Sequence, residues 1–268
     1  MLKTERQDAI VQEVLRKGVA SVSELAALLD VSEITIRRDL DELSEGGRLE
    51  RVRGGARQRR PRGPEAPVVQ RQASQRAEKR AIALAAADLI ADGDVIALES
   101  GSTTLELARV VATRIWQNLQ VITNSFSILD ELLAVPGVQL VFVGGFVNPA
   151  ELGTFGTLAE DTLKRLNIDK LFLGCRGLDP HTGLSNDVQA EMEIATVRAF
   201  VAASSWVVVL ADHTKFGHAF SLQMLPMTAV DVIVTDDLTP ASILNELSQE
   251  KRVIVATVEK GGCGASVR

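Results

Sequence analysis

The residues best suited to chemistry in this 268-residue sequence follow short apolar stretches in its C-terminal part. ESGSTT, from Glu99 to Thr104, lies between one such stretch and a helical pattern. Its small residues would let backbone N–H groups and hydroxyls face an anion at the positive end of the following helix. Lys215, in DHTK, would add a point charge, and Asp212 or Glu99 would accept hydrogen bonds from sugar hydroxyls. These residue types predict a pocket for a hydroxylated anion.

Other loops with polar residues or glycine follow further apolar stretches. Asn124 follows one stretch, Gly144-Gly145-Phe146 another and Gly174-Cys175-Arg176-Gly177 a third. One such loop is typical of an ordinary chain turn. Ligands of α/β proteins, however, bind at the carboxyl ends of the strands, where all these loops should lie. Together they indicate a single pocket.

Two residues of the third loop have alternative interpretations. Arg176 either contacts a second anionic group of a ligand or is an ordinary surface arginine. Cys175 is expected to be a small buried residue rather than a nucleophile, because no histidine lies beside it in the sequence.

The elements that must position these loops alternate between helical and apolar patterns. Helices are expected at 79–91, 103–112, 125–133, 158–166, 190–203 and 240–249. Strands are expected at 95–98, 121–123, 139–143, 171–173, 207–211, 230–234 and 253–256. Because continuous β-branched runs between helices are typical of a covered sheet, the pattern predicts an α/β domain with a mainly parallel sheet.

The N-terminal region contains three helical patterns with their own start signals. Thr4 and Gln7 have capping-box spacing, as have Ser21 and Glu24. Ser32 is the expected cap of the third helix. Because only a few residues join the second and third patterns, the region predicts a helix-turn-helix.

The third of these helices has two distinct faces. Ile36, Leu40 and Leu43 fall on one side and should pack on the first two helices. The residues expected on or beside the outward face near the helix start are Ser32, Ile34, Thr35, Arg37 and Arg38. In a helix-turn-helix that end meets base edges, and an outward Ile34 suits a thymine methyl. The alternative is a solvated helix face with an incidental isoleucine.

A basic segment, RLERVRGGARQRRPRGP, follows the third helix. Leu49 and Val52 could anchor a short β-hairpin, and the Gly54-Gly55 pair allows a tight turn. The side chains expected to point to water or DNA are Arg48, Arg51 and Arg53. The segment is interpreted as a wing followed by a linker, the alternative being a solvated basic linker alone.

The distribution of charge favours local phosphate contact. The net charge is −6, yet Met1 to Arg62 holds 13 Lys and Arg against 11 Asp and Glu. The basic excess lies from Arg48 to Arg62, where seven arginines are opposed by Glu50 alone. A positive segment beside an acidic domain is typical of a protein that meets nucleic acid locally.

Several classes of protein are disfavoured. The sequence has no apolar run long enough for a membrane span, and its first residues are too charged for a signal peptide. Its two cysteines have neither metal-ligand spacing nor a disulfide framework. A cytoplasmic protein without cofactor or metal is therefore expected.

The segment from Glu5 to Ala56, which ends SVSELAALLDVSEITIRRDLDELSEGGRLERVRGGA, resembles the DNA-binding domain of the DeoR family of bacterial regulators. VSEITIRRDL is the most specific part. The resemblance implies a winged helix-turn-helix. Arg53 departs from the pattern, because family members often carry histidine there.

The C-terminal part resembles the sensor domain of the same family. The matching segments are EKRAIALAAADLIADGDVIALESGSTT, ITNS, VFVGGF, DKLFLGCRGLD, GLSN and LADHTKFG. That domain is related in fold to ribose-5-phosphate isomerase A and CoA transferases. The family implies a phosphorylated sugar or polyol as effector.

The resemblance also implies effector contacts. The candidates for phosphate are Gly101, Ser102, Thr103, Thr104 and Lys215, and Asn124, Gly145, Glu193 and Asp212 also match the pattern. Glu99 departs from it, because the first position of this loop is usually aspartate. The effector's identity therefore cannot be copied from a relative.

The expected organisation is a winged helix-turn-helix at 1–57, a basic proline-containing linker at 58–76, an effector-sensing α/β domain at 77–260 and a tail at 261–268. The resemblance implies a repressor of a carbohydrate catabolic operon that an effector releases from double-stranded operator DNA. Two-fold repeated half-sites would require a homo-oligomer, a dimer or a tetramer. The alternative is an enzyme like a sugar-phosphate isomerase that carries a DNA-binding domain.

Overall fold

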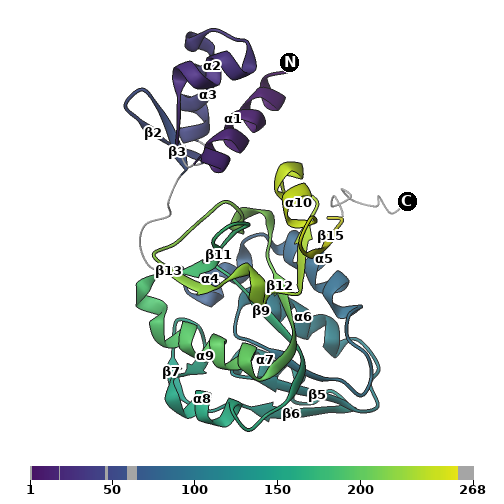
Figure 1. Ribbon diagram of the computed structural model, residues 1–268. Coiled ribbons are helices and arrows are strands. Elements are labelled where there is room, and N and C mark those ends of the chain that lie inside the picture. Colours follow the sequence, from purple (N-terminus) through teal and green to yellow (C-terminus); the bar gives the residue numbers. More distant parts are fainter. Residues whose placement is uncertain (1, 18, 46–47, 59–64, 259–268) are drawn as a thin grey trace, which may run out of the picture. The chain divides into compact units, whose positions relative to one another are not determined.

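The computed structural model describes residues 2–17, 19–45, 48–58 and 65–258 (Figure 1). The chain divides into two compact units, the first extending to residue 63 and the second beginning at residue 64. Part of the expected linker, 59–64, and the expected tail, 261–268, lie outside the described residues. In the part of the chain that is described, no helix is long and apolar enough to cross a membrane.

The first unit is a winged helix-turn-helix. Its helices are α1 (Lys3–Lys17), α2 (Val22–Leu29) and α3 (Glu33–Glu45). An antiparallel sheet of order β1-β3-β2 is formed by β1 (Val19–Ser21), β3 (Gly55–Gln58) and β2 (Leu49–Val52). The expected helices and the hairpin of the wing are confirmed.

Local hydrogen bonds determine where the helices of this unit begin. The Ser21 hydroxyl accepts from the Glu24 amide at 3.2 Å while the Ser21 amide donates to the Glu24 carboxylate at 2.8 Å, which confirms this capping box. The box expected from Thr4 is wrong because α1 already begins at Lys3, so Thr4 lies inside its first turn. The amide of Leu2 donates to Glu5 Oε2 at 2.9 Å, so the first turn of α1 is held by a different pair.

The core of the first unit confirms the inward face of α3. Ile36, Leu40 and Leu43 are buried, and they belong to one cluster with apolar residues of α1, α2 and the wing. Asp39 of α3 is 1% exposed, and the Arg6 Nε atom donates to its carboxylate at 2.6 Å. Since a buried carboxylate needs a partner, this pair fixes α1 against α3.

The second unit is built on a parallel sheet of order β15-β14-β12-β9-β4-β5-β6. The strands are β4 (Val95–Leu98), β5 (Leu119–Thr123), β6 (Val138–Phe142), β9 (Ile168–Gly174), β12 (Ser204–Leu210), β14 (Val232–Asp236) and β15 (Arg252–Ala256). Every neighbouring pair is parallel. The mainly parallel sheet and its expected strands are confirmed.

Helices cover this sheet, as its apolar strands require. They are α5 (Arg76–Ala87), α6 (Ser102–Ala112), α7 (Phe126–Leu132), α8 (Thr157–Leu163), α9 (Glu191–Ala202) and α10 (Ala241–Leu247), at the positions that the sequence predicts. The helices α5, α6 and α7 (Figure 1) share one apolar cluster with alternate residues of the strands. α9 packs on β12 outside this cluster.

Several short elements are not predicted by the sequence. They are the hairpin of β7 (Phe146–Asn148) and β8 (Gly153–Phe155), the small sheet of β10 (Gly177–Asp179), β11 (Gly183–Asn186) and β13 (Leu222–Leu225), and helix α4 (Val68–Ala73). Strands of three or four residues are too short for a clear hydrophobic period.

Helix α4 corrects the expected linker. Val68 is 3% exposed, and its amide donates to the carbonyl of Ala150 at 2.8 Å. The prolines and charges of the segment suggested a solvated connection. One buried valine and one backbone hydrogen bond instead tie its second half, from residue 65, to the second unit.

Candidate functional site

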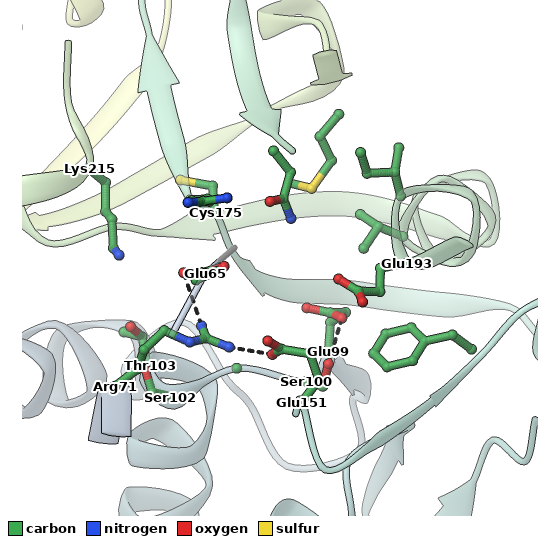
Figure 2. Close-up of a pocket in the computed structure, with 18 residues that line it drawn as sticks. Glu65, Arg71, Glu99, Ser100, Ser102, Thr103, Glu151, Cys175, Glu193 and Lys215 are labelled. Carbon is green, nitrogen blue, oxygen red and sulfur yellow. Dashed lines mark hydrogen bonds and ion pairs between the residues drawn. The ribbon is translucent and has the colours of Figure 1, made fainter. Parts of the chain in front are cut away.

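A pocket opens where strands β4, β9 and β12 end, at neighbouring positions of the sheet. Of the residues expected to bind effector, those that line it are Glu99, Gly101, Ser102, Thr103, Arg176, Glu193 and Lys215. Figure 2 shows Lys215 and the loop residues Ser102 and Thr103 projecting toward this space. Parallel strands bring their carboxyl ends to one edge, so loops distant in sequence meet here.

The loop after β4 leads directly into the start of α6. The Leu105 amide donates to the Gly101 carbonyl at 3.0 Å as the helix begins. The preceding amides, at Ser102 and Thr103, belong to the first helical turn, where N–H groups lack an intrahelical acceptor. Because both residues line the pocket, the start of the helix faces it, an arrangement that suits an anion.

Four expected contact residues lie behind the pocket lining. They are Thr104, Asn124, Gly145 and Asp212. The Asn124 side chain is buried, accepts from the Ser100 amide at 3.0 Å and donates to the Thr154 carbonyl at 3.0 Å. The Thr104 hydroxyl donates to the Gly101 carbonyl at 3.0 Å. Both residues therefore support the loop that begins at Glu99.

Asp212 and Gly145 also have structural partners. Asp212 is 1% exposed and accepts from the Thr214 amide at 3.0 Å, which caps the short 3-10 helix His213–Lys215 that carries the lysine. A Cβ atom at Gly145 would lie 2.6 Å from the carbonyl oxygen of Phe155. The close approach of two backbone segments accounts for glycine at this position.

Acidic side chains make up another part of the lining. Glu99 is 6% exposed, and burial raises its pKa to about 8 despite a hydrogen bond from Ser100. Burial also raises the pKa of Glu193, whose carboxylate accepts from Asn148 Nδ2 at 2.6 Å. Glu151 has a raised pKa from the same cause. Among the residues described, no cluster of His, Cys, Asp or Glu is arranged to hold a metal ion.

Sequence reasoning missed three charged residues of the pocket. Glu65, Arg71 and Glu151 line it, and the Arg71 guanidinium forms ion pairs with both carboxylates (Figure 2). Arg71 and Glu65 lie in the stretch interpreted as linker, and Glu151 lies in the turn between β7 and β8. No local signal in the sequence distinguishes these residues from ordinary surface charges.

The structure excludes one of the two alternatives for Arg176. Its side chain is 8% exposed, lines the pocket and pairs with Asp187, so it is not a surface arginine. Cys175 beside it also lines the pocket, and it is partly exposed rather than fully buried. Burial of its thiol raises the pKa to about 12, which keeps it protonated and a poor nucleophile.

The outward face of α3 carries the residues expected to meet DNA. Ile34 is 77% exposed and Arg38 is exposed. The Ser32 hydroxyl accepts from the Thr35 amide at 3.2 Å, which confirms Ser32 as the helix cap. Arg37 pairs with Glu33 at 2.8 Å on the flank of this face.

The wing arginines differ in their surroundings. Arg53 is exposed beside the turn at Gly54, whose φ of 84° suits glycine. Arg48 pairs with Asp8 at 2.7 Å. Arg51 does not simply point to solvent, because its guanidinium binds Asp41 at 2.9 Å and the Gly55 carbonyl at 2.8 Å. The wing is held together by one of the residues expected to contact DNA.

These features define a class of protein. A winged helix-turn-helix with an exposed α3 face is a DNA-binding module, and the second unit carries a pocket lined by the start of a helix and by Lys215. The chain is thus a DNA-binding transcription regulator with a sensor domain.

Comparison with known families gives the particular family. Residues 6–61 match the DeoR-like helix-turn-helix domain, and residues 74–237 match the DeoR C terminal sensor domain. The chain belongs to the DeoR family.

Relatives in this family are named as repressors. The transcriptional repressor AccR of Agrobacterium fabrum is 35% identical over 72% of this chain and 74% of its own length. A putative aga operon transcriptional repressor of Escherichia coli O157:H7 is 32% identical over 91% of this chain and 90% of its own. The glycerol-3-phosphate regulon repressor of Escherichia coli K12 is 30% identical over 66% and 69%.

Among solved structures, ribose 5-phosphate isomerase A from Methanocaldococcus jannaschii is similar to this chain. The TM-score is 0.38 with 21% sequence identity, over 52% of this chain and 53% of the isomerase. A likeness at this level says nothing of activity.

Proposed function

We propose that this protein represses a carbohydrate catabolic operon and that a phosphorylated sugar or polyol releases it from the operator. The observation that carries the proposal is the start of α6, where Ser102 and Thr103 face a pocket that Lys215 also lines. The names of relatives support it, because they include repressors of an aga operon and of a glycerol-3-phosphate regulon.

The pocket offers complementary groups for both parts of such a ligand. The phosphate would accept hydrogen bonds from the first-turn amides of α6 and from the Lys215 ammonium. The sugar hydroxyls would meet Glu99 and Glu193. Because the pKa of Glu99 is about 8, its carboxyl group is mostly protonated at neutral pH and can donate as well as accept a hydrogen bond.

The DNA-binding unit would contact an operator in two ways. Ile34, Thr35 and Arg38 would meet base edges in the major groove, and Arg53 would contact phosphates. Two-fold related half-sites call for a homo-oligomer, a dimer or a tetramer. Because a bacterial operator lies in the cytoplasm, the protein would act in that compartment.

We propose further that the pocket binds its ligand without chemical turnover. The observation that supports this is that Asp212, the acid nearest Lys215 in sequence, is buried behind the lining and serves as a helix cap. An isomerase assay with ribose 5-phosphate tests this point. Measurable turnover would favour the alternative of an isomerase-like enzyme that carries a DNA-binding domain.

Calorimetry tests the ligand class. The protein is titrated with a panel of sugar and polyol phosphates and with their unphosphorylated parents, and binding is expected for phosphorylated compounds alone. A compound that binds should also weaken the complex with the promoter upstream of the protein's own gene in a mobility-shift assay. Equal affinity for a phosphate and its parent would falsify the assignment.

A further inference from the structure

The segment that opens the second unit is attached to the effector pocket. Six residues, 59–64, separate the end of β3 from Glu65, so this segment receives the chain directly from the DNA-binding unit. The Val68 amide donates to the Ala150 carbonyl at 2.8 Å, and Lys79 Nζ donates to the Ser74 carbonyl at 2.8 Å. Hydrogen bonds thus hold α4 at both ends.

The Arg71 guanidinium is the point at which α4 enters the pocket. Its Nε donates to the Ala66 carbonyl at 2.9 Å, and its terminal nitrogens pair with Glu65 and Glu151. The three side chains of this ion pair cluster are only 14–20% exposed. Glu151 belongs to the turn of the β7–β8 hairpin, so the Arg71–Glu151 pair joins α4 to that hairpin.

Arg71 lies beside the expected phosphate position. Figure 2 shows its guanidinium on the side of the pocket that carries Ser102 and Thr103, between Glu65 and Glu151. An anion at the start of α6 would attract this guanidinium and repel the two carboxylates. Of the other cations in the lining, Arg176 is held by Asp187, outside that arrangement.

We propose that Arg71 is an effector-binding residue and that an anionic group of the effector takes its guanidinium from Glu151. The exchange weakens the attachment of α4 to the β7–β8 hairpin, and α4 passes the change to the chain that leads to the DNA-binding unit. This inference rests on the proposed function, since it requires an anionic effector in the pocket. It adds the residue that couples the pocket to the linker.

The exchange explains how binding of the effector could be coupled to binding of the operator. A ligand shifts a conformational equilibrium only if it binds one arrangement more tightly than the other. Here the two arrangements differ in the partner of Arg71, a carboxylate of the protein or an anion of the effector. A guanidinium suits this exchange because its planar set of donors matches carboxylate and phosphate alike.

The test uses the full chain with two substitutions and a matched control. Glu151→Gln removes the competing carboxylate, and Arg71→Gln removes the guanidinium. Asp161→Asn, in the exposed Lys164–Asp161 pair of α8, is the control for loss of an acid. Inorganic phosphate, glycerol 3-phosphate and glucose 6-phosphate are the calorimetric probes, and hydrogen exchange reports on the Val68 amide.

Competition between Glu151 and the effector for Arg71 predicts opposite changes in probe affinity for the two variants. Glu151→Gln should bind the probe about 5-fold tighter or more, at the lower end of typical couplings, because the probe no longer competes with Glu151 for the Arg71 guanidinium. Arg71→Gln should bind it about tenfold more weakly. In the wild type and in Asp161→Asn, a bound probe should speed exchange at Val68, whereas Glu151→Gln should exchange fast without it.

The outcomes separate this inference from the proposed function. If the wild type binds a probe but Glu151→Gln, folded by circular dichroism, binds it no tighter, Glu151 is merely structural and this inference is overturned. If the wild type binds no phosphorylated compound, the proposed function fails and the inference falls with it. Should Glu151→Gln not fold, Arg71→Gln decides, and undiminished affinity for the probe in that variant overturns the inference.

Discussion

At the scale of single residues, the most unusual feature of the pocket is its buried carboxyl groups with raised pKa values. Glu99 is almost fully buried, and both Glu151 and Glu193 contribute to its raised pKa. Carboxyl groups that interact in this way titrate as a set rather than one by one. The protonation of these carboxyl groups is therefore linked to the stability of the fold.

The stability of the protein should consequently fall as pH rises. The folded-state pKa of Glu99 is raised from 4.5 to about 8, so its contribution is fully present below pH 4.5 and is lost through about pH 8. The loss is at most about 1.4 kcal/mol for each pH unit in this window. Thermal unfolding between pH 5 and 9 should show a weaker pH dependence for Glu99→Gln than for the wild type. An identical slope in both proteins would mean that Glu99 does not titrate there.

At the scale of elements, α3 and the wing differ in the side chains that they leave exposed for DNA. α3 presents exposed Ile34 and Arg38, whereas Arg48 and Arg51 of the wing are engaged by carboxylates of the same unit. Charges already paired within the protein gain less from a phosphate than free ones do, because the existing pair must be broken. Arg53 is therefore the wing residue that we expect to contribute most to phosphate contact.

Substitutions in α3 and in the wing should separate sequence-specific DNA recognition from sequence-independent DNA affinity. Arg38→Ala should cost about 1–3 kcal/mol of operator binding and relax the preference for one base, since it removes a base contact. Arg53→Ala is the comparison, and it should weaken all sequences alike and lower the salt slope by about 1. Titrations of operator and scrambled DNA at several salt concentrations measure both effects. Unchanged operator affinity in Arg38→Ala would contradict the assignment of this face.

At the scale of the whole molecule, the two units must be thermodynamically linked for an effector to act. Lys215 is suited to testing that link, because it lines the pocket and lies in a different unit from α3. Typical coupling free energies are about 1–3 kcal/mol, or about 5–150-fold in affinity. A substitution that removes this coupling should leave both units folded.

Lys215→Ala should bind operator like the wild type and fail to respond to effector. The reason is that the substitution removes a point charge that attracts phosphate without touching the DNA-binding surface. Operator titrations of both proteins, with and without the effector found by calorimetry, measure the result. Loss of DNA binding in the variant would show that Lys215 is structural, and a response at the same effector concentration would place the phosphate elsewhere.

Much of this molecule follows from its sequence alone. The capping box at Ser21, the inward face of α3 and the strands of the parallel sheet all arise from contacts between near neighbours or from short hydrophobic periods. The loop from Glu99 to Thr104 is also local, because a strand end and the next helix start define it. Such features are predictable because few residues determine them.

The composition of the pocket was decided by tertiary structure. Arg71 and Glu151 lie 80 positions apart in sequence and meet only because Val68 docks α4 on the β7–β8 hairpin. Asn124 and Asp212 match a binding pattern, yet packing turns them toward backbone groups behind the lining. A charged side chain has the same appearance in a sequence whether it faces solvent or a cavity. The difference is the free energy of burial, which depends on neighbours that the fold brings from a distance.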